Sequence, residues 1–179
     1  MSQINTTAAL ELQGVTMRLA GLTAVDNASF AVPAGKIVSL IGPNGAGKTT
    51  TYNVISGYMK PTSGRVKLFG HDITGMAPEQ ISQLGLVRSF QRTSIFSACT
   101  VAENILTALH LKGECGVLHA LLRTQKFRRE EADLKSQAND LLAFLGLGAR
   151  AHTLASNLSY GEQRLLGVGL ALAAKPKVL

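Results

Sequence analysis

The stretch that decides the fold reads Gly42-Pro43-Asn44-Gly45-Ala46-Gly47-Lys48-Thr49. Its glycines let the backbone bend tightly, so that several N–H groups turn toward one point and form a nest for an anion. Lys48 adds a mobile positive charge suited to phosphate oxygens, and the Thr49 hydroxyl is suited to Mg²⁺. The pattern therefore predicts a phosphate-binding loop. The alternative is a glycine-rich turn with an accidental lysine.

The residues around the loop provide the context that this interpretation requires. Residues Ile37 to Ile41 are β-branched or apolar with one serine, which is typical of a strand buried on both faces. A helix is expected from Lys48 to about Ser56, ended by Gly57. The N-terminus of that helix would add positive potential to the phosphate site.

The remaining chain predicts an α/β core followed by a helical insert. From Thr100 to Ala151 the apolar period changes to that of helices, beginning at a capping box formed by Thr100 and Glu103. A further amphipathic helix is expected from Leu134 to Leu145, ended by Gly146. Strands are expected at Leu10–Leu19, Ala28–Val32, Arg65–Phe69 and Leu86–Phe90, with a short helix at Glu79–Leu84.

Composition narrows the function classes. The 179 residues include no Trp and only 5% aromatics, which gives little support to nucleic-acid binding by stacked aromatic rings. No stretch has the apolar length of a membrane-spanning helix, and the N-terminus lacks the basic start of a signal peptide. The net charge of +7 favours an anionic ligand or surface, or reflects the absence of an acidic C-terminal part.

A second motif follows the helical insert. Residues Leu158 to Gln163 read Leu-Ser-Tyr-Gly-Glu-Gln and open another apolar segment. Ser159 and Glu162 fit a capping box by themselves. A capped helix start with a glycine beside it is also a surface that can donate to a phosphate, so the structural and functional interpretations are compatible.

Together the two motifs resemble those of the ATP-binding subunits of ABC transporters. The resemblance implies a P-loop NTPase core with an N-terminal antiparallel β subdomain and a helical subdomain, and it implies ATP and Mg²⁺ as ligands. It also implies a role for Gln91, which falls at the family's Q-loop and would contact Mg²⁺, although alone it would be an ordinary surface residue. The ATP-binding residues so implied are Gly42, Pro43, Asn44, Gly45, Ala46, Gly47, Lys48, Thr49, Thr50 and Gln91, of which Thr49 and Gln91 would bind the metal.

In this family the second motif is the signature that acts in trans, on ATP held by the other subunit of a dimer. The residues assigned to that role are Leu158, Ser159, Tyr160, Gly161, Glu162 and Gln163. The implied segments are a nucleotide-binding core at 1–91, a helical subdomain at 92–157, and the signature with its helix at 158–179.

Three departures from the family pattern stand out. Leu19 occupies a position where the family often has an aromatic residue that stacks on adenine. The helix after the signature lacks the several charges that the family usually has there, and it contains Gly167 and Gly169, which are tolerated if the helix is tightly packed. The chain is expected to be incomplete at the C-terminus, since no acidic residue follows Glu162 and the general base is therefore absent.

The segments 19–25, 87–91 and 100–104 look most like subunits of branched-chain amino acid importers. The resemblance implies a second ATP-binding subunit and membrane permease subunits as partners, at the cytoplasmic face of the inner membrane. Two alternatives remain: a fragment that binds nucleotide without turnover, and a soluble ABC ATPase outside transport, which usually has a longer insertion or two cassettes.

Overall fold

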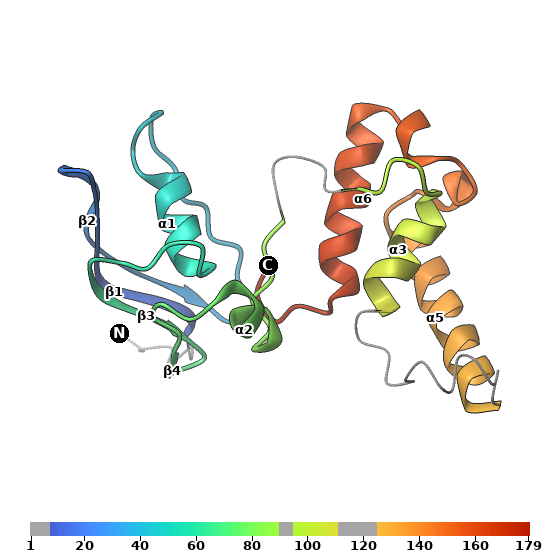
Figure 1. Ribbon diagram of the computed structural model, residues 1–179, viewed down its shortest axis with the longest axis horizontal. Coiled ribbons are helices and arrows are strands. Elements are labelled where there is room, and N and C mark those ends of the chain that lie inside the picture. Colours follow the sequence, from blue (N-terminus) through green and yellow to red (C-terminus); the bar gives the residue numbers. More distant parts are fainter. Residues whose placement is uncertain (1–7, 90–94, 111–124) are drawn as a thin grey trace, which may run out of the picture. The chain divides into compact units, whose positions relative to one another are not determined.

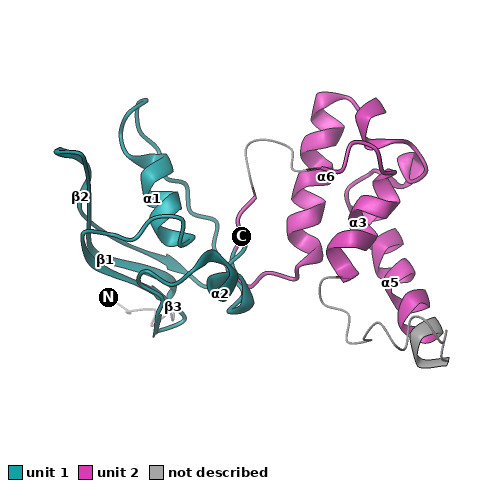
Figure 2. Cartoon of the chain, in the orientation of Figure 1, with its two compact units in different colours: residues 1–87, 178 teal, residues 88–177, 179 magenta. Residues whose placement is uncertain are grey.

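The computed structural model describes residues 8–89, 95–110 and 125–179. The chain divides into two compact units, drawn in different colours in Figure 2. Unit 1 comprises residues 1–87 with Val178, and unit 2 comprises residues 88–177 with Leu179. Figure 1 shows that unit 1 carries the sheet, whereas unit 2 is built from helices. The predicted mixed α/β architecture with a separate helical part is therefore present.

Unit 1 is organised around a four-stranded antiparallel sheet with the order β2-β1-β3-β4. Strands β1 (Ala8–Leu19) and β2 (Leu22–Pro33) form a hairpin in which Leu19 pairs with Leu22. Its two turn residues have φ angles of 45° at Ala20 and 87° at Gly21, the backbone of a type I′ turn. The predicted first strand is confirmed, and the predicted second one is the end of a longer strand. Strands β3 (Ser63–Leu68) and β4 (His71–Asp72) complete the sheet.

Two helices pack on this sheet (Figure 1). Helix α1 (Lys48–Ile55) contributes Val54 and Ile55 to the core, and helix α2 (Pro78–Gln83) contributes Ile81. The predicted end of α1 is also found, because Ser56 caps the helix and Gly57 follows with φ 77°. The core residues from the strands are Leu10, Leu12, Val15, Met17, Val25, Val66 and Leu68.

The predicted buried strand from Ile37 to Ile41 is wrong. These residues form no strand, Ile37 is 100% exposed, and Ile41 is 88% exposed. A strand is stabilised by its neighbours in a sheet, and no described strand pairs with this segment. The predicted strand from Leu86 is reduced to a parallel bridge with Val178, in which the Val87 N–H donates to the Val178 carbonyl at 2.9 Å. Phe90 lies outside the described residues.

Unit 2 has three described α-helices, α3 (Val101–His110), α5 (Gln125–Phe144) and α6 (Tyr160–Ala173). Two short 3₁₀ helices, η1 (Gly148–Arg150) and η2 (Ala155–Asn157), lie between α5 and α6. The predicted amphipathic helix is confirmed as the second half of α5, which is followed by Gly146 with φ 70°. Its apolar face packs with α3 and α6 into a second core that includes Val101, Ile105, Leu134, Ala138, Leu142 and Leu166.

Asn104 fixes the segment that precedes α3. Its side chain is fully buried, and its Oδ1 accepts the Phe96 N–H at 2.8 Å. Its Nδ2 donates to the carbonyls of Phe96, at 3.0 Å, and Thr100, at 2.9 Å. The predicted capping box is confirmed in the same region, because Thr100 N–H donates to the Glu103 carboxylate at 2.7 Å while Glu103 N–H donates to the Thr100 hydroxyl at 3.2 Å.

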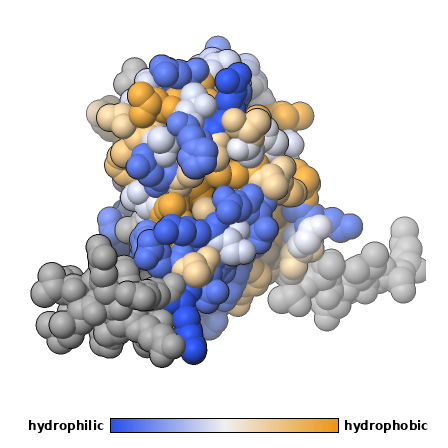
Figure 3. All heavy atoms as spheres, turned by 90° about the vertical axis from the view of Figure 1, so that its right-hand side faces the viewer, coloured by the Kyte–Doolittle hydropathy of each residue, from blue (hydrophilic) through white to orange (hydrophobic). Residues whose placement is uncertain are grey.

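The surface of unit 2 carries apolar side chains among polar ones. Figure 3 looks onto its side and shows hydrophobic areas between hydrophilic residues. The described large apolar side chains that are exposed in unit 2 are Phe96, Phe144, Leu154, Tyr160, Leu165, Val168 and Leu179. No helix among the described residues is long and apolar enough to cross a membrane.

The two glycines of α6 have different surroundings. A Cβ at Gly169 would lie 2.6 Å from the Leu145 Cδ1 and 3.0 Å from the Ile105 Cδ1. A Cβ at Gly167 would meet no atom within 4 Å. Close packing therefore accounts for Gly169, and the structure offers no such reason for Gly167.

This difference gives a matched pair of variants. Gly167→Ala is expected to raise the free energy of unfolding by about 0.5–1 kcal/mol, because alanine favours a helix interior. Gly169→Ala is expected to lower it by about 1–3 kcal/mol, because the added methyl overfills the core between α6, α3 and α5. Urea unfolding followed by circular dichroism measures both. Equal shifts in the same direction would contradict the packing of α6.

Candidate functional site

The predicted phosphate-binding loop leads directly into α1 in unit 1. Gly45 and Gly47 have φ angles of 87° and 76°, which L side chains rarely adopt. Gly47 is the N-cap of α1, and a Cβ there would overlap the carbonyl oxygen of Ala24 in β2. Glycine is thus required at position 47 both for its backbone conformation and for the close approach of the loop to β2.

The start of α1 has no side-chain cap. Gly47 offers no side-chain acceptor, and no acidic residue lies in the first turn. The first N–H groups of a helix have no partner inside the helix, so here they are available to a ligand. Thr49, the second residue of the helix, is exposed. Thr51 differs, because its hydroxyl donates back to the Gly47 carbonyl at 3.0 Å.

The side chain of Lys48 folds over the loop. Its Nζ donates to the carbonyl oxygens of Gly42 and Pro43, each at 2.7 Å. An ammonium group has three N–H donors, so these two bonds leave one for an anion. The loop itself is tightened by a hydrogen bond of 3.2 Å from the Ala46 N–H to the Pro43 carbonyl. Backbone donors and a lysine ammonium together are suited to a phosphate group.

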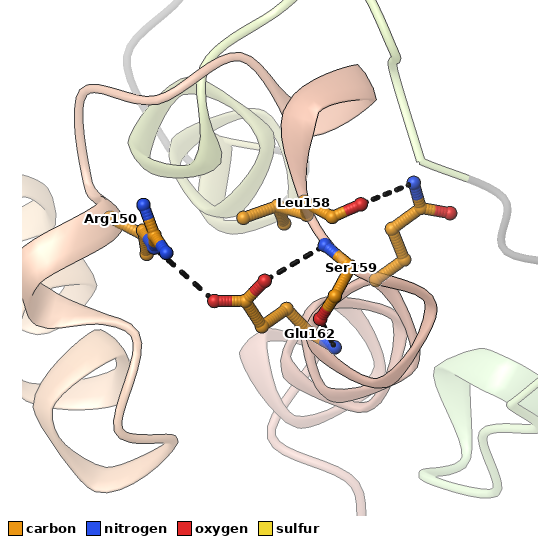
Figure 4. A network of polar contacts seen from close by, with 5 residues as sticks. Arg150, Leu158, Ser159 and Glu162 are labelled. Atoms are coloured by element: carbon orange, nitrogen blue, oxygen red, sulfur yellow. Dashed lines mark hydrogen bonds and ion pairs between the residues drawn. The ribbon is translucent and has the colours of Figure 1, made fainter.

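The second motif forms the N-terminus of α6 in unit 2, and Figure 4 shows its hydrogen bonds. Ser159 is the N-cap, and its Oγ accepts the Glu162 N–H at 3.3 Å. The Glu162 Oε2 accepts the Ser159 N–H at 2.8 Å. Gln163 donates through Nε2 to the carbonyl of the buried Leu158 at 3.1 Å. The predicted capping box is therefore confirmed.

The remaining residues of this motif lie on the surface. Gly161 is exposed, and a Cβ there would meet no atom within 4 Å. Tyr160 is 66% exposed, and the Arg164 guanidinium lies over its ring, 5.1 Å from the centroid. The glycine leaves the first turn of α6 open to the approach of a ligand or another protein.

Glu162 carries a charge at neutral pH. The N–H and hydroxyl of Ser159 lower the pKa of its carboxyl group, and Arg150 lowers it further. Arg150 belongs to η1, and its Nε lies 3.3 Å from the Glu162 Oε1. The side chains of Arg150 and Glu162 are 56% and 27% exposed, so this ion pair is only partly shielded from water.

The predicted residues thus fall into two groups. The phosphate-binding loop belongs to unit 1, and the signature belongs to unit 2. Gln91 lies outside the described residues. Among the residues that the structure describes, no cluster of His, Cys, Asp and Glu could hold a metal ion.

Sequence reasoning missed two side chains, Asn104 and Arg150. Asn104 had a sequence signal, since it is a lone amide among the apolar residues of a predicted helix. Arg150 had none, because its contact with Glu162 joins residues 12 positions apart through the turns between α5 and α6.

Comparison with known proteins identifies the family. The family model described as ABC transporter matches residues 25–179. The chain belongs to the ABC transporter family. This result confirms the membership that the two sequence motifs predicted.

Several members of the ABC transporter family resemble the chain along most of its length. LivG of Salmonella typhimurium, a high-affinity branched-chain amino acid transport ATP-binding protein, is 41% identical over 170 residues, which cover 95% of this chain and 67% of LivG. BraF of Pseudomonas aeruginosa, described in the same words, is 38% identical over 170 residues. The chain spans about two thirds of the length of both relatives.

Solved ATP-binding cassettes of ABC transporters share the fold. The ADP conformation of MJ1267 matches with a TM-score of 0.79 and 33% identity, covering 96% of this chain and 66% of that one. A nucleotide-free cassette matches with a TM-score of 0.76 and 32% identity. The predicted fold class is therefore confirmed.

Proposed function

We propose that the chain is the nucleotide-binding part of an ATP-binding subunit of an ABC importer. The observation that carries this proposal is the start of α1, where uncapped backbone donors, the left-handed Gly47 and the folded Lys48 side chain converge on one loop. The ADP-bound state of the related MJ1267 cassette supports a nucleotide as the anion.

In this proposal the loop binds the phosphates of ATP. The backbone N–H of Gly45 and those from Gly47 to Thr50 donate to phosphate oxygens, and Lys48 balances the phosphate charge. The side chains of Asn44 and Thr50 lie on the same loop and helix start and are proposed to contact the phosphates as well. Pro43 and Ala46 contribute backbone shape, since the Ala46 N–H donates to the Pro43 carbonyl and tightens the turn.

The chemistry of the donor set fits Mg²⁺. The exposed Thr49 hydroxyl and the amide oxygen of Gln91 are hard oxygen ligands of the kind that this cation prefers. When bound with ATP, the cation would neutralise phosphate charge and orient the nucleotide. The adenine would have an aliphatic neighbour in Leu19, which is 38% exposed at the end of the β1–β2 hairpin.

The signature is proposed to complete the site of a second subunit. The exposed Gly161 leaves room for a nucleotide at the first turn of α6, and the helix N-terminus favours negative charge there. Two copies, or one copy and a related subunit, would then enclose ATP between the loop of one and the signature of the other.

The transport role is proposed from the relatives. LivG and BraF are branched-chain amino acid transport ATP-binding proteins, and these amino acids are the proposed solutes. The subunit would act at the cytoplasmic face of the inner membrane with integral-membrane permease subunits. Phe96 and Leu154, exposed on unit 2, are candidates for contact with a permease.

The first test concerns Lys48. Lys48→Ala is expected to weaken the binding of Mg²⁺·ATP by about 10- to 150-fold, because a charge-assisted contact of about 1.5–3 kcal/mol is lost. Isothermal titration calorimetry measures the affinity. Lys60→Ala removes the same charge from another exposed position of unit 1 and serves as the matched control. Equal affinities of the Lys48 variant and the parent would contradict the assigned role.

The second test separates the two motifs. Gly161→Asp is expected to spare ATP binding to the single chain but to abolish ATP-driven dimerisation of the complete gene product. An aspartate in the first turn suits the helix, so folding is preserved, whereas its charge would face the phosphates across the interface. Ser136→Asp, which adds the same charge at an exposed position of α5, is the control. Size-exclusion chromatography with ATP measures the dimer, and a normal dimer from the Gly161 variant would refute the assignment in trans.

A further inference from the structure

The start of α6 is proposed to face a phosphate, and Glu162 places a negative charge there. Its carboxylate is held by the Ser159 N–H at 2.8 Å, so it cannot turn away without breaking the cap. An uncompensated carboxylate at this position would repel a phosphate. A signature with glutamate therefore needs a positive charge on the side opposite to Ser159.

Arg150 lies where that charge is needed. Figure 4 shows the Glu162 carboxylate between Ser159 and Arg150, with one oxygen bound on each side. Arg150 is itself fixed by its backbone, because its N–H donates to the Leu147 carbonyl at 2.9 Å and its carbonyl accepts the Thr153 N–H at 2.8 Å. The guanidinium thus comes from a separate, ordered turn rather than from the signature.

The same contacts orient Ser159. Its Oγ accepts the Glu162 N–H and its N–H donates to the Glu162 Oε2, so both the side chain and the backbone of Ser159 are fixed at the start of α6. This orientation depends on the capping box, and the capping box includes the carboxylate that Arg150 holds.

We propose that Arg150 is a positioning residue for the signature: it holds the Glu162 carboxylate in the capping box and compensates its charge. This inference rests on the proposed function, in which Ser159 and the start of α6 meet the phosphate of a nucleotide on a second subunit. Arg150 itself does not touch the nucleotide. Because partly exposed ion pairs contribute little to folding, the contribution of Arg150 is to ATP-driven association.

The test is a double-mutant cycle in the complete gene product, with Arg150→Gln, Glu162→Gln and both together. Arg150→Gln is expected to raise the ATP concentration that gives half-maximal dimer roughly tenfold, because the Glu162 charge is left uncompensated. ATP affinity of the single chain and the thermal unfolding midpoint are expected to stay at parent values. Arg150→Lys keeps the charge. The logarithm of its half-maximal ATP concentration is expected to rise by no more than half as much as that of Arg150→Gln.

The Glu162→Gln background makes the test specific. A glutamine at position 162 still offers an amide oxygen to the Ser159 N–H but carries no charge, so adding Arg150→Gln there is expected to change the dimer midpoint less than twofold. An equal tenfold effect in both backgrounds would mean that Arg150 contacts the nucleotide directly and would overturn the positioning role. No effect of Arg150→Gln in the parent would overturn it as well.

The parent protein distinguishes a failure of this inference from a failure of the proposed function. If ATP drives the parent to a dimer and Arg150→Gln behaves like the parent, the inference fails and the proposed function stands. If ATP binds the parent without any dimer, the in-trans role of the signature fails, and the role of Arg150 fails with it.

Discussion

The left-handed backbone of Gly47 is the constraint on which the site in unit 1 depends. With φ at 76°, Gly47 ends the loop and begins α1 without a side-chain cap, which leaves the first helix donors for a ligand. The same residue passes so close to the Ala24 carbonyl that any side chain would collide with it. One glycine thus lets the loop approach the sheet closely and leaves backbone donors at the start of α1 for a ligand.

The two helix starts with candidate functions are built in opposite ways. Helix α1 begins without side-chain acceptors, and the Lys48 ammonium, bonded to the carbonyls of its own loop, adds positive charge beside the free donors. Helix α6 begins with a complete capping box, so its cap is formed from the chain itself. In the proposed function, the start of α1 binds the phosphates of ATP within one chain, and the start of α6 meets the phosphates held by another chain. The capping box of α6 also places a carboxylate beside that surface, and Arg150 is proposed to compensate its charge.

Local features were predictable from the sequence, and features that need distant partners were not. The loop, both capping boxes and the amphipathic part of α5 depend on residues a few positions apart, whose spacing is visible in the chain. The segment from Ile37 to Ile41 has strand composition, but a strand also needs a paired neighbour, and none of the described strands supplies one. The Arg150–Glu162 pair and the close approach to Gly169 depend on how α5, α3 and α6 pack, which no local pattern encodes.

The assignment of the two sites is tested most directly by following backbone amides with nuclear magnetic resonance while Mg²⁺·ATP is added to dilute chain. The amide signals of Gly47, Lys48 and Thr49 are expected to shift strongly, because their N–H groups bind phosphate oxygens. The signals of Ser159 and Gly161 are expected to stay unchanged while the chain is a monomer. Shifts at the start of α6 with none at the start of α1 would contradict the assignment of the two sites, and an absence of all shifts would contradict nucleotide binding itself.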